Sequence, residues 1–130
     1  MYLCSRIVLT MTAICIALGG LYDIFMPRLP SNLADKCSGN ESACIVIREL
    51  LRALGACLVA IGATVGMVIG TMDLKHDPRA MALILTLVLP SEGLNAMGMR
   101  RLGSPYVVPV LFILLTVTGA VLTMLAPDAL

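Results

Sequence analysis

The sequence predicts an all-α fold, a four-helix transmembrane antiparallel bundle, in a single membrane domain covering residues 1–130. Four stretches carry no Asp, Glu, Lys or Arg: residues 7–22, 53–72, 80–91 and 102–127. The second and fourth, with 20 and 26 residues, are each long enough to cross a hydrocarbon core of about 30 Å as a helix. Apolar residues make up 59% of the chain and charged residues only 13%, whereas soluble domains have roughly 45–50% and about 25%.

The apolar runs exclude several other classes of protein. A water-soluble domain of this size could not bury so much apolar surface. In a bilayer the backbone must bond to itself, as helices or a closed barrel, and these runs are too long and too little alternating for barrel strands. The net charge of +1 and the absence of Trp give no basic stripe and few stacking platforms, so we expect no nucleic-acid partner.

The first span is expected at about residues 5–26. Pro27 and Pro30 end it, because proline cannot continue a helix. Arg6 followed by an apolar run is also how a signal peptide begins, but no clear A-x-A cleavage site follows, so we expect a retained span. A long polar loop, residues 27–46, comes next. Its Cys37 and Cys44 are close enough in sequence to form a disulfide.

The second span is expected at about residues 47–72, and small residues mark one of its faces. Gly62, Gly66 and Gly70 form a double G-x-x-x-G pattern, which lets another backbone approach closely in lipid. The pattern favours helix packing within the chain, and a homodimer seam is the alternative. Arg48, Arg52, Gly55 and Val59 continue the same steps of three and four, so Arg52 is expected on the glycine face.

The third and fourth spans are expected at about residues 79–99 and 105–126. Pro78 suits the opening of the third, and Pro90 predicts a kink within it. A turn at residues 103–105 leads to the fourth. The short connections imply antiparallel neighbours.

Two signals of membrane orientation disagree. The side of the termini carries three basic residues (Arg6, Lys75 and Arg79), and the opposite side carries six (Arg28, Lys36, Arg48, Arg52, Arg100 and Arg101). The positive-inside rule would place the long loop in the cytoplasm. A Cys37–Cys44 disulfide would place it in an oxidising compartment. We expect an integral membrane protein with cytoplasmic termini and the loop outside.

The charged and polar residues in or near the spans suggest one polar pocket. Charges within a bilayer cost about 2.5–3.5 kcal/mol each on insertion scales, so they face a partner or a cavity. The residues expected to converge below the long loop are Asp23, Glu49, Arg52, Glu92, Asn95 and Arg100. They form either a structural ion-pair network or a site for a ligand or ion.

No residue pattern indicates an enzyme, a cofactor or a metal site. The single histidine, His76, lacks a neighbouring Cys ligand pair, and no nucleophile elbow or Walker loop is present. We therefore expect no catalytic residues, cofactor or metal ligands, and a protein that is not an enzyme.

Residues 49–56 (Glu-Leu-Leu-Arg-Ala-Leu-Gly-Ala) and the run 58–62 resemble the opening of the second span in small bacterial four-helix membrane proteins of unknown function, grouped with the DoxX-like proteins. Those proteins are also similar in a proline-bearing loop after the first helix and in a Gly/Arg end to the third, here Gly98-Met99-Arg100. The resemblance implies a four-helix bundle of the bacterial inner membrane without an established activity.

Two functions remain open. In the first, the polar pocket binds a small amphipathic or lipid-like ligand, or the chain is a subunit of a membrane complex. In the second, the chain is a small proton-coupled transporter that uses Glu92 or Asp23. The expected partners are membrane lipids, a small lipophilic ligand, and a second copy or a larger membrane complex.

Overall fold

The computed structural model describes residues 1–26, 29–37 and 39–127, without the side chains of Asn32 and Lys36. Within these residues the chain is all-helical and has no strand, as predicted. The five helices are α1 (Tyr2–Phe25), α2 (Ser31–Lys36), α3 (Glu41–Thr71), α4 (Pro78–Leu102) and α5 (Val107–Met124). Pro27 lies outside the described residues, and α1 ends before it.

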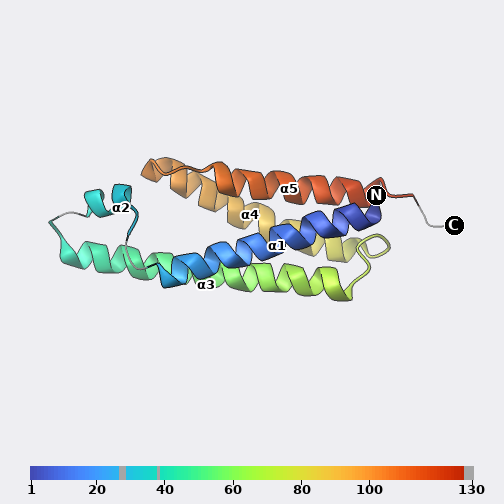
Figure 1. Cartoon of the computed structure of the whole chain (residues 1–130), viewed down its shortest axis with the longest axis horizontal. Helices are drawn as coiled ribbons and strands as arrows, with labels where there is room; N and C mark the ends of the chain where they lie inside the picture. Colours follow the sequence, from blue (N-terminus) through green and yellow to red (C-terminus); the bar gives the residue numbers. More distant parts are fainter. Residues whose placement is uncertain (27–28, 38, 128–130) are drawn as a thin grey trace.

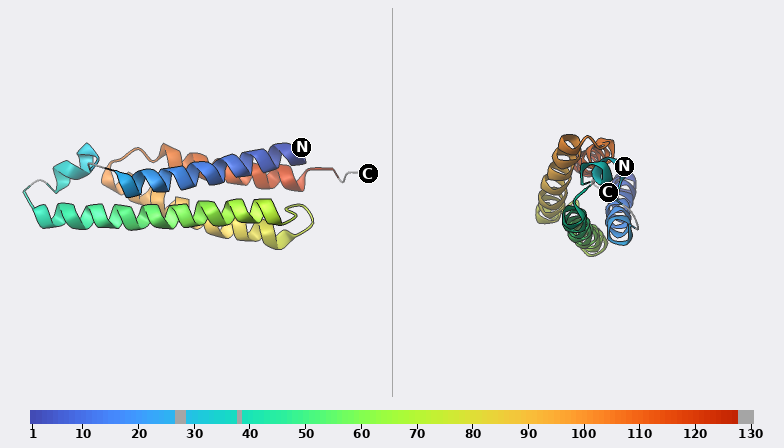
Figure 2. Two further views of the ribbon diagram at one scale, coloured as in Figure 1. Left: turned by 60° about the horizontal axis from the view of Figure 1, so that its bottom comes forward. Right: turned by 90° about the vertical axis from the view of Figure 1, so that its left-hand side faces the viewer.

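Four long helices lie lengthwise beside one another, and α2 is a short extra helix at one end (Figure 1). Helix α1 packs mainly against α3 and also against α5, while α4 packs against α5 and α3. The start of α1 and the end of α5 lie at one end of the molecule, and α2 lies at the other. Helix α3 has 31 residues and α1 has 24, so α3 reaches beyond α1 at the α2 end (Figure 2).

The helix boundaries follow capping signals in the sequence. Asn40 precedes α3, and its side chain accepts a hydrogen bond from the Ala43 amide at 3.1 Å. Asp77 caps α4 in the same way, with Pro78 in the first helical position. Gly103 ends α4 at a φ of 73°, which glycine adopts without the steric penalty of a Cβ atom. Helix α4 runs unbroken through Pro90.

Apolar side chains cover the outside of the molecule as well as its interior. The core contains Leu9, Ile16, Ile84 and Val88, each at most 1% exposed. In every long helix, however, only 28% to 33% of the most apolar 18 residues are buried. Large apolar side chains such as Leu3, Met67 and Leu114 therefore face outward along the helices. All four long helices are long and apolar enough to cross a membrane.

Helices α1 and α3 approach each other through small residues. A Cβ atom added to Gly62 would lie 2.7 Å from the Ala13 carbonyl oxygen, and one added to Gly20 would lie 2.8 Å from the Val59 amide nitrogen. A Cβ atom added to Gly55 would likewise lie too close to the Gly20 carbonyl oxygen. Glycine is needed at these positions because the two backbones leave no room for a side chain.

The predicted glycine seam extends less far than the sequence pattern suggested. A Cβ atom added to Gly66 or Gly70 would meet nothing within 4 Å, so neither residue packs against another helix of the described chain. The buried face of α3 contains Leu58, Gly62, Val65 and Ile69. At 100° per residue, Gly70 lies about 80° around the helix from Gly62 and leaves this face.

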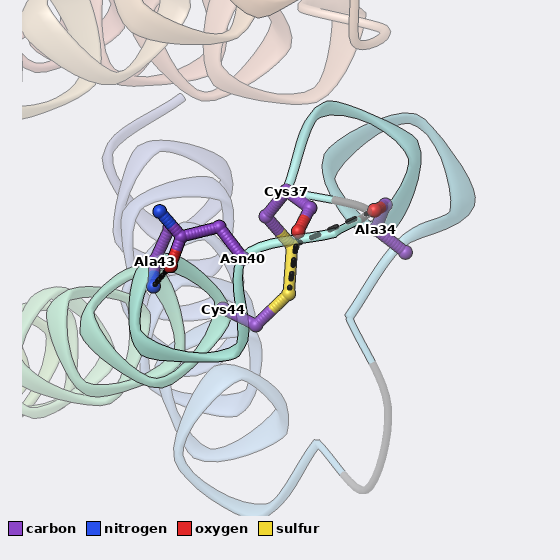
Figure 3. Close-up of a disulfide and its surroundings, with 5 residues drawn as sticks. All are labelled: Ala34, Cys37, Asn40, Ala43 and Cys44. Carbon is purple, nitrogen blue, oxygen red and sulfur yellow. Dashed lines mark hydrogen bonds between the residues drawn. A yellow bond between two sulfur atoms is a disulfide. The ribbon is translucent and has the colours of Figure 1, made fainter.

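A disulfide joins α2 to α3. Cys37 follows the last residue of α2, Cys44 lies in the first turn of α3, and their Cα atoms are 5.4 Å apart (Figure 3). The bond closes the turn that contains Asn40, the residue that caps α3. The crosslink lies at the end of the molecule opposite the start of α1 (Figure 1).

Candidate functional site

Among the described side chains that are less than 2% exposed, Glu92 is the only one with an ionisable group. It is 1% exposed, and Asn95, three residues further on, is its hydrogen-bonding neighbour. The second carboxyl oxygen, Oε2, is buried without a hydrogen-bond partner among the described residues. A buried polar atom without a partner is costly and calls for a functional or structural explanation.

The helical repeat of α4 explains why Glu92 is buried. Ile84, Val88 and Glu92 follow one another at intervals of four residues and are all buried, so the glutamate continues the core face of the helix. It lies about 21 Å along the helix from Pro78 and about 15 Å from Leu102, at about 1.5 Å per residue. The carboxyl group is therefore far from both ends of α4.

The backbone beside Glu92 is altered by a proline. Pro90 has no amide hydrogen, so it cannot donate to the carbonyl one turn earlier. Next to it, the Ser91 hydroxyl donates to the carbonyl oxygens of Leu87 at 2.8 Å and Val88 at 3.0 Å. Ser91 thus provides local hydrogen bonds to the backbone in the turn that carries Glu92.

The other predicted members of the polar pocket lie elsewhere. Asp23 is half-buried between α1 and α3, and its Cβ atom lies against Gly55. It lines a cleft of about 10 Å³ together with Arg48 and Leu51. A volume of this size is about enough for one water molecule and excludes an organic ligand.

Glu49 and Arg52 pair with each other on the surface of α3. The carboxyl Oε1 atom of Glu49 lies 2.7 Å from Nη1 of Arg52, and the two side chains are 59% and 47% exposed. Arg100 is exposed in the last turn of α4. The structure therefore brings Glu92 and Asn95 together, and it corrects the prediction that all six residues converge.

Helix geometry explains this difference. Arg52 lies about 80° around α3 from Gly62 at 100° per residue, although the steps of three and four suggested one face. Steps of three and four drift around a helix when they are not balanced, so the predicted stripe was too long.

A second polar group, at the opposite end of the molecule, was not predicted. The Asp73 carboxylate accepts hydrogen bonds from the Lys75 amide at 3.0 Å and from the Tyr2 hydroxyl at 3.4 Å, and its other oxygen lies 2.8 Å from Nδ1 of His76. Arg6 donates from Nη2 to the Ile69 carbonyl at 2.8 Å. The sequence separation of 71 between Tyr2 and Asp73 hides this contact in the sequence, although the spacing of Asp73 and His76 is a local signal.

Metal ligands do not cluster in the part of the chain that the structure describes. No three His, Cys, Asp or Glu side chains there lie close enough to hold a metal ion. Cys4, Cys15 and Cys57 are exposed and unbridged.

Fold and site together define an all-helical protein with four helices capable of crossing a membrane and one carboxyl group buried among them. Comparison of the chain with protein-family models, with curated proteins and with solved structures finds no match. The resemblance to DoxX-like proteins therefore stays a prediction.

Proposed function

We propose that the chain is an integral membrane protein that crosses the bilayer four times as an antiparallel bundle. The support is the outward-facing apolar surface of four helices with 18 to 31 residues each. The shortest, α5, has a length of about 27 Å at about 1.5 Å per residue, close to the thickness of a hydrocarbon core. Lipid tails would cover the apolar side chains that the interior leaves exposed.

The proposed orientation places α2 outside and the termini in the cytoplasm of a bacterial cell. The Cys37–Cys44 disulfide supports it, because disulfides persist in oxidising compartments such as the periplasm. Among the opposing basic residues, Arg52 is paired with Glu49 and contributes less net charge to that side. The start of α1 then lies at the cytoplasmic surface.

Within this bundle, Glu92 serves as a proton-binding group of a small proton-coupled transporter. The observation that carries this proposal is the buried Oε2 atom, which has no hydrogen-bond partner among the residues that the structure describes. An unpaired carboxylate in an apolar interior is costly, and intramembrane acids are typical of proton pathways. A bound proton would neutralise the Glu92 carboxylate. Release of the proton would require the carboxylate to reach water or a cation.

Ligand binding at the six predicted residues has less support. Those residues do not share a cavity, and the cleft beside Asp23 measures about 10 Å³. Assembly into a homodimer or a larger complex is favoured by one observation. Gly66 and Gly70 have no neighbour within 4 Å at the Cβ position, which leaves α3 open to close approach by another helix.

Infrared spectroscopy of the reconstituted protein tests whether Glu92 holds a proton. Wild-type protein at neutral pH should show the carbonyl band of a protonated carboxyl group, and Glu92→Gln should lose it. The matched control is Glu49→Gln, which removes an exposed carboxylate and should keep the band. A wild-type spectrum without this band would contradict proton binding.

Uptake by proteoliposomes tests transport. A pH gradient across the vesicle should drive accumulation of at least one compound from a panel of amphipathic cations, anions and neutral solutes. Uptake should disappear in Glu92→Gln and remain in Glu49→Gln. If wild-type vesicles take up none of the panel under any gradient, the transporter proposal fails.

A further inference from the structure

A pocket lies at the end of the molecule where α1 begins and α3 ends. Its volume is about 530 Å³, and it is lined by Tyr2, Arg6, Asp73, Lys75 and His76, among others. This pocket is separate from Glu92 and from the cleft beside Asp23. Its volume falls within the range of small-molecule sites, about 300–1,000 Å³.

Arg6 is held in place at this pocket by two neighbours. Its Nη2 atom donates to the Ile69 carbonyl oxygen at 2.8 Å, and its guanidinium lies over the Tyr2 ring at 6.0 Å from the centroid. A guanidinium group has five N–H donors in a rigid fork. The bond to Ile69 therefore fixes the side chain and leaves donors for a ligand in the pocket.

Asp73 organises the loop that forms the other wall. Its carboxylate accepts from the backbone amides of Lys75 and His76, and from the Tyr2 hydroxyl of α1. These bonds hold Lys75 and His76 against the start of α1. Among the residues that line the pocket, Arg6 and Lys75 are basic and Asp73 is acidic, so the formal charge of these three side chains is +1.

The position of the pocket indicates the kind of anion it meets. Its lining residues come mainly from the start of α1, the end of α3 and the loop that follows. These segments lie at the end of the molecule opposite α2 (Figure 1), which is the cytoplasmic end in the proposed orientation. Anionic lipids give the cytoplasmic leaflet a negative surface, and basic pockets at the ends of membrane helices bind lipid headgroups. The guanidinium fork of Arg6 matches the geometry of phosphate oxygens.

We propose that this pocket binds a phosphate group, supplied by the headgroup of an anionic phospholipid, through Arg6 and Lys75. This inference rests on the proposed membrane crossing and orientation and is independent of proton binding at Glu92. The Tyr2 hydroxyl and the Asp73 carboxylate act as positioning groups, since they hold the two walls together.

Native mass spectrometry of the detergent-solubilised full chain tests the proposal with dioleoyl phosphatidic acid and dioleoyl phosphatidylcholine. Wild-type protein should bind phosphatidic acid more tightly. Arg6→Gln and Lys75→Gln should each weaken that binding by about fivefold, the effect expected for one basic residue near a charged surface. Arg79→Gln is the matched control because Arg79 is exposed at the same end and does not line the pocket.

The remaining arms distinguish the sources of phosphate and guard against misfolding. Displacement of phosphatidic acid by millimolar inorganic phosphate would assign the pocket to free phosphate, and no displacement would assign it to the lipid. Circular dichroism checks the helix content of each variant, and Lys75→Gln decides alone if Arg6→Gln does not fold. Equal affinity for the two lipids, or the same loss in Arg79→Gln, would overturn the proposal, whereas Glu92→Gln should bind like wild type.

Discussion

The Ser5 hydroxyl donates a hydrogen bond to the Gly119 carbonyl oxygen at 2.7 Å, which ties the first turns of α1 to the last turns of α5. Thr123 takes part in the same group, because its hydroxyl donates to that carbonyl at 2.9 Å and also contacts the Ser5 hydroxyl. Ser5 is 0% exposed and Thr123 is 2% exposed. This small polar group therefore connects helices that are more than 110 residues apart in the sequence.

Replacement of Ser5 by Ala tests this connection. The variant loses the bond between α1 and α5. Its free energy of unfolding should fall by about 0.6 kcal/mol, the average measured for hydrogen bonds between membrane helices, and by no more than about 1.7 kcal/mol, the measured maximum. Titration with a denaturing detergent, followed by circular dichroism, gives the value. Ser42→Ala is the control, since Ser42 is exposed on α3; an equal loss in both variants would contradict the role of Ser5.

Two glycines of α3 should respond differently to replacement by alanine, as measured by the free energy of unfolding. Gly62→Ala places a Cβ atom 2.7 Å from the Ala13 carbonyl oxygen, so the variant should be destabilised by about 1–3 kcal/mol through overpacking. Gly66→Ala meets nothing within 4 Å and should be neutral, or more stable by about 0.5–1 kcal/mol from helix propensity. The same detergent titration measures both. If Gly66→Ala is destabilised as much as Gly62→Ala, the packing of α3 differs from this structure.

The sequence predicted the four long helices because their signals are local, but it placed α2 and the first six residues of α3 in a polar loop, residues 27–46. The charge-free runs, Pro78 at the start of α4 and Gly103 at its end are each read from residues that are contiguous in the sequence. The polar pocket could not be predicted in the same way, because it required the rotation of each helix about its axis. Arg52 and Glu92 were both expected below the long loop, yet Arg52 faces outward and Glu92 is buried.

Asp73 should titrate at unusually low pH. The hydrogen bond from His76 and those from the loop amides hold its pKa at about 2, below the ordinary 3.8. Since the pKa is lowered in the folded state, any stabilisation from these bonds is present above pH 3.8 and is lost as the pH falls through about 2. In His76→Ala the pKa should rise toward 3.8. Carbon-13 NMR of the labelled carboxyl group measures it, and Arg79→Ala should leave it unchanged.

Cysteine labelling tests the proposed orientation. In a variant with Cys4, Cys15 and Cys57 changed to Ser, only the Cys37–Cys44 pair remains. After mild reduction of intact cells, a membrane-impermeant maleimide should label this pair, because the loop is proposed to lie outside. Cells of the same variant without reduction are the control and should stay unlabelled. Labelling that requires permeabilisation would reverse the orientation and would move the phosphate pocket to the outer leaflet.

Glu92→Leu separates a functional acid from a structural one. Leucine at this position continues the buried face of Ile84 and Val88 and removes the Oε2 atom that lacks a partner. The free energy of unfolding should therefore rise by about 1–3 kcal/mol, as when other buried ionisable groups are replaced by apolar side chains. Detergent titration of the helical signal measures the change. A functional site commonly keeps such a costly residue at the expense of stability.

Glu49→Leu is the matched control for this prediction, because Glu49 is exposed and its pair with Arg52 contributes little; the change should stay within about 0.5 kcal/mol. If Glu92 instead stabilised the bundle by bonding to a neighbouring helix, Glu92→Leu would leave that partner unsatisfied. The bundle would then be destabilised by several kcal/mol. A more stable Glu92→Leu variant that has lost the infrared band of the protonated carboxyl group would show that this residue is retained for what its carboxyl binds.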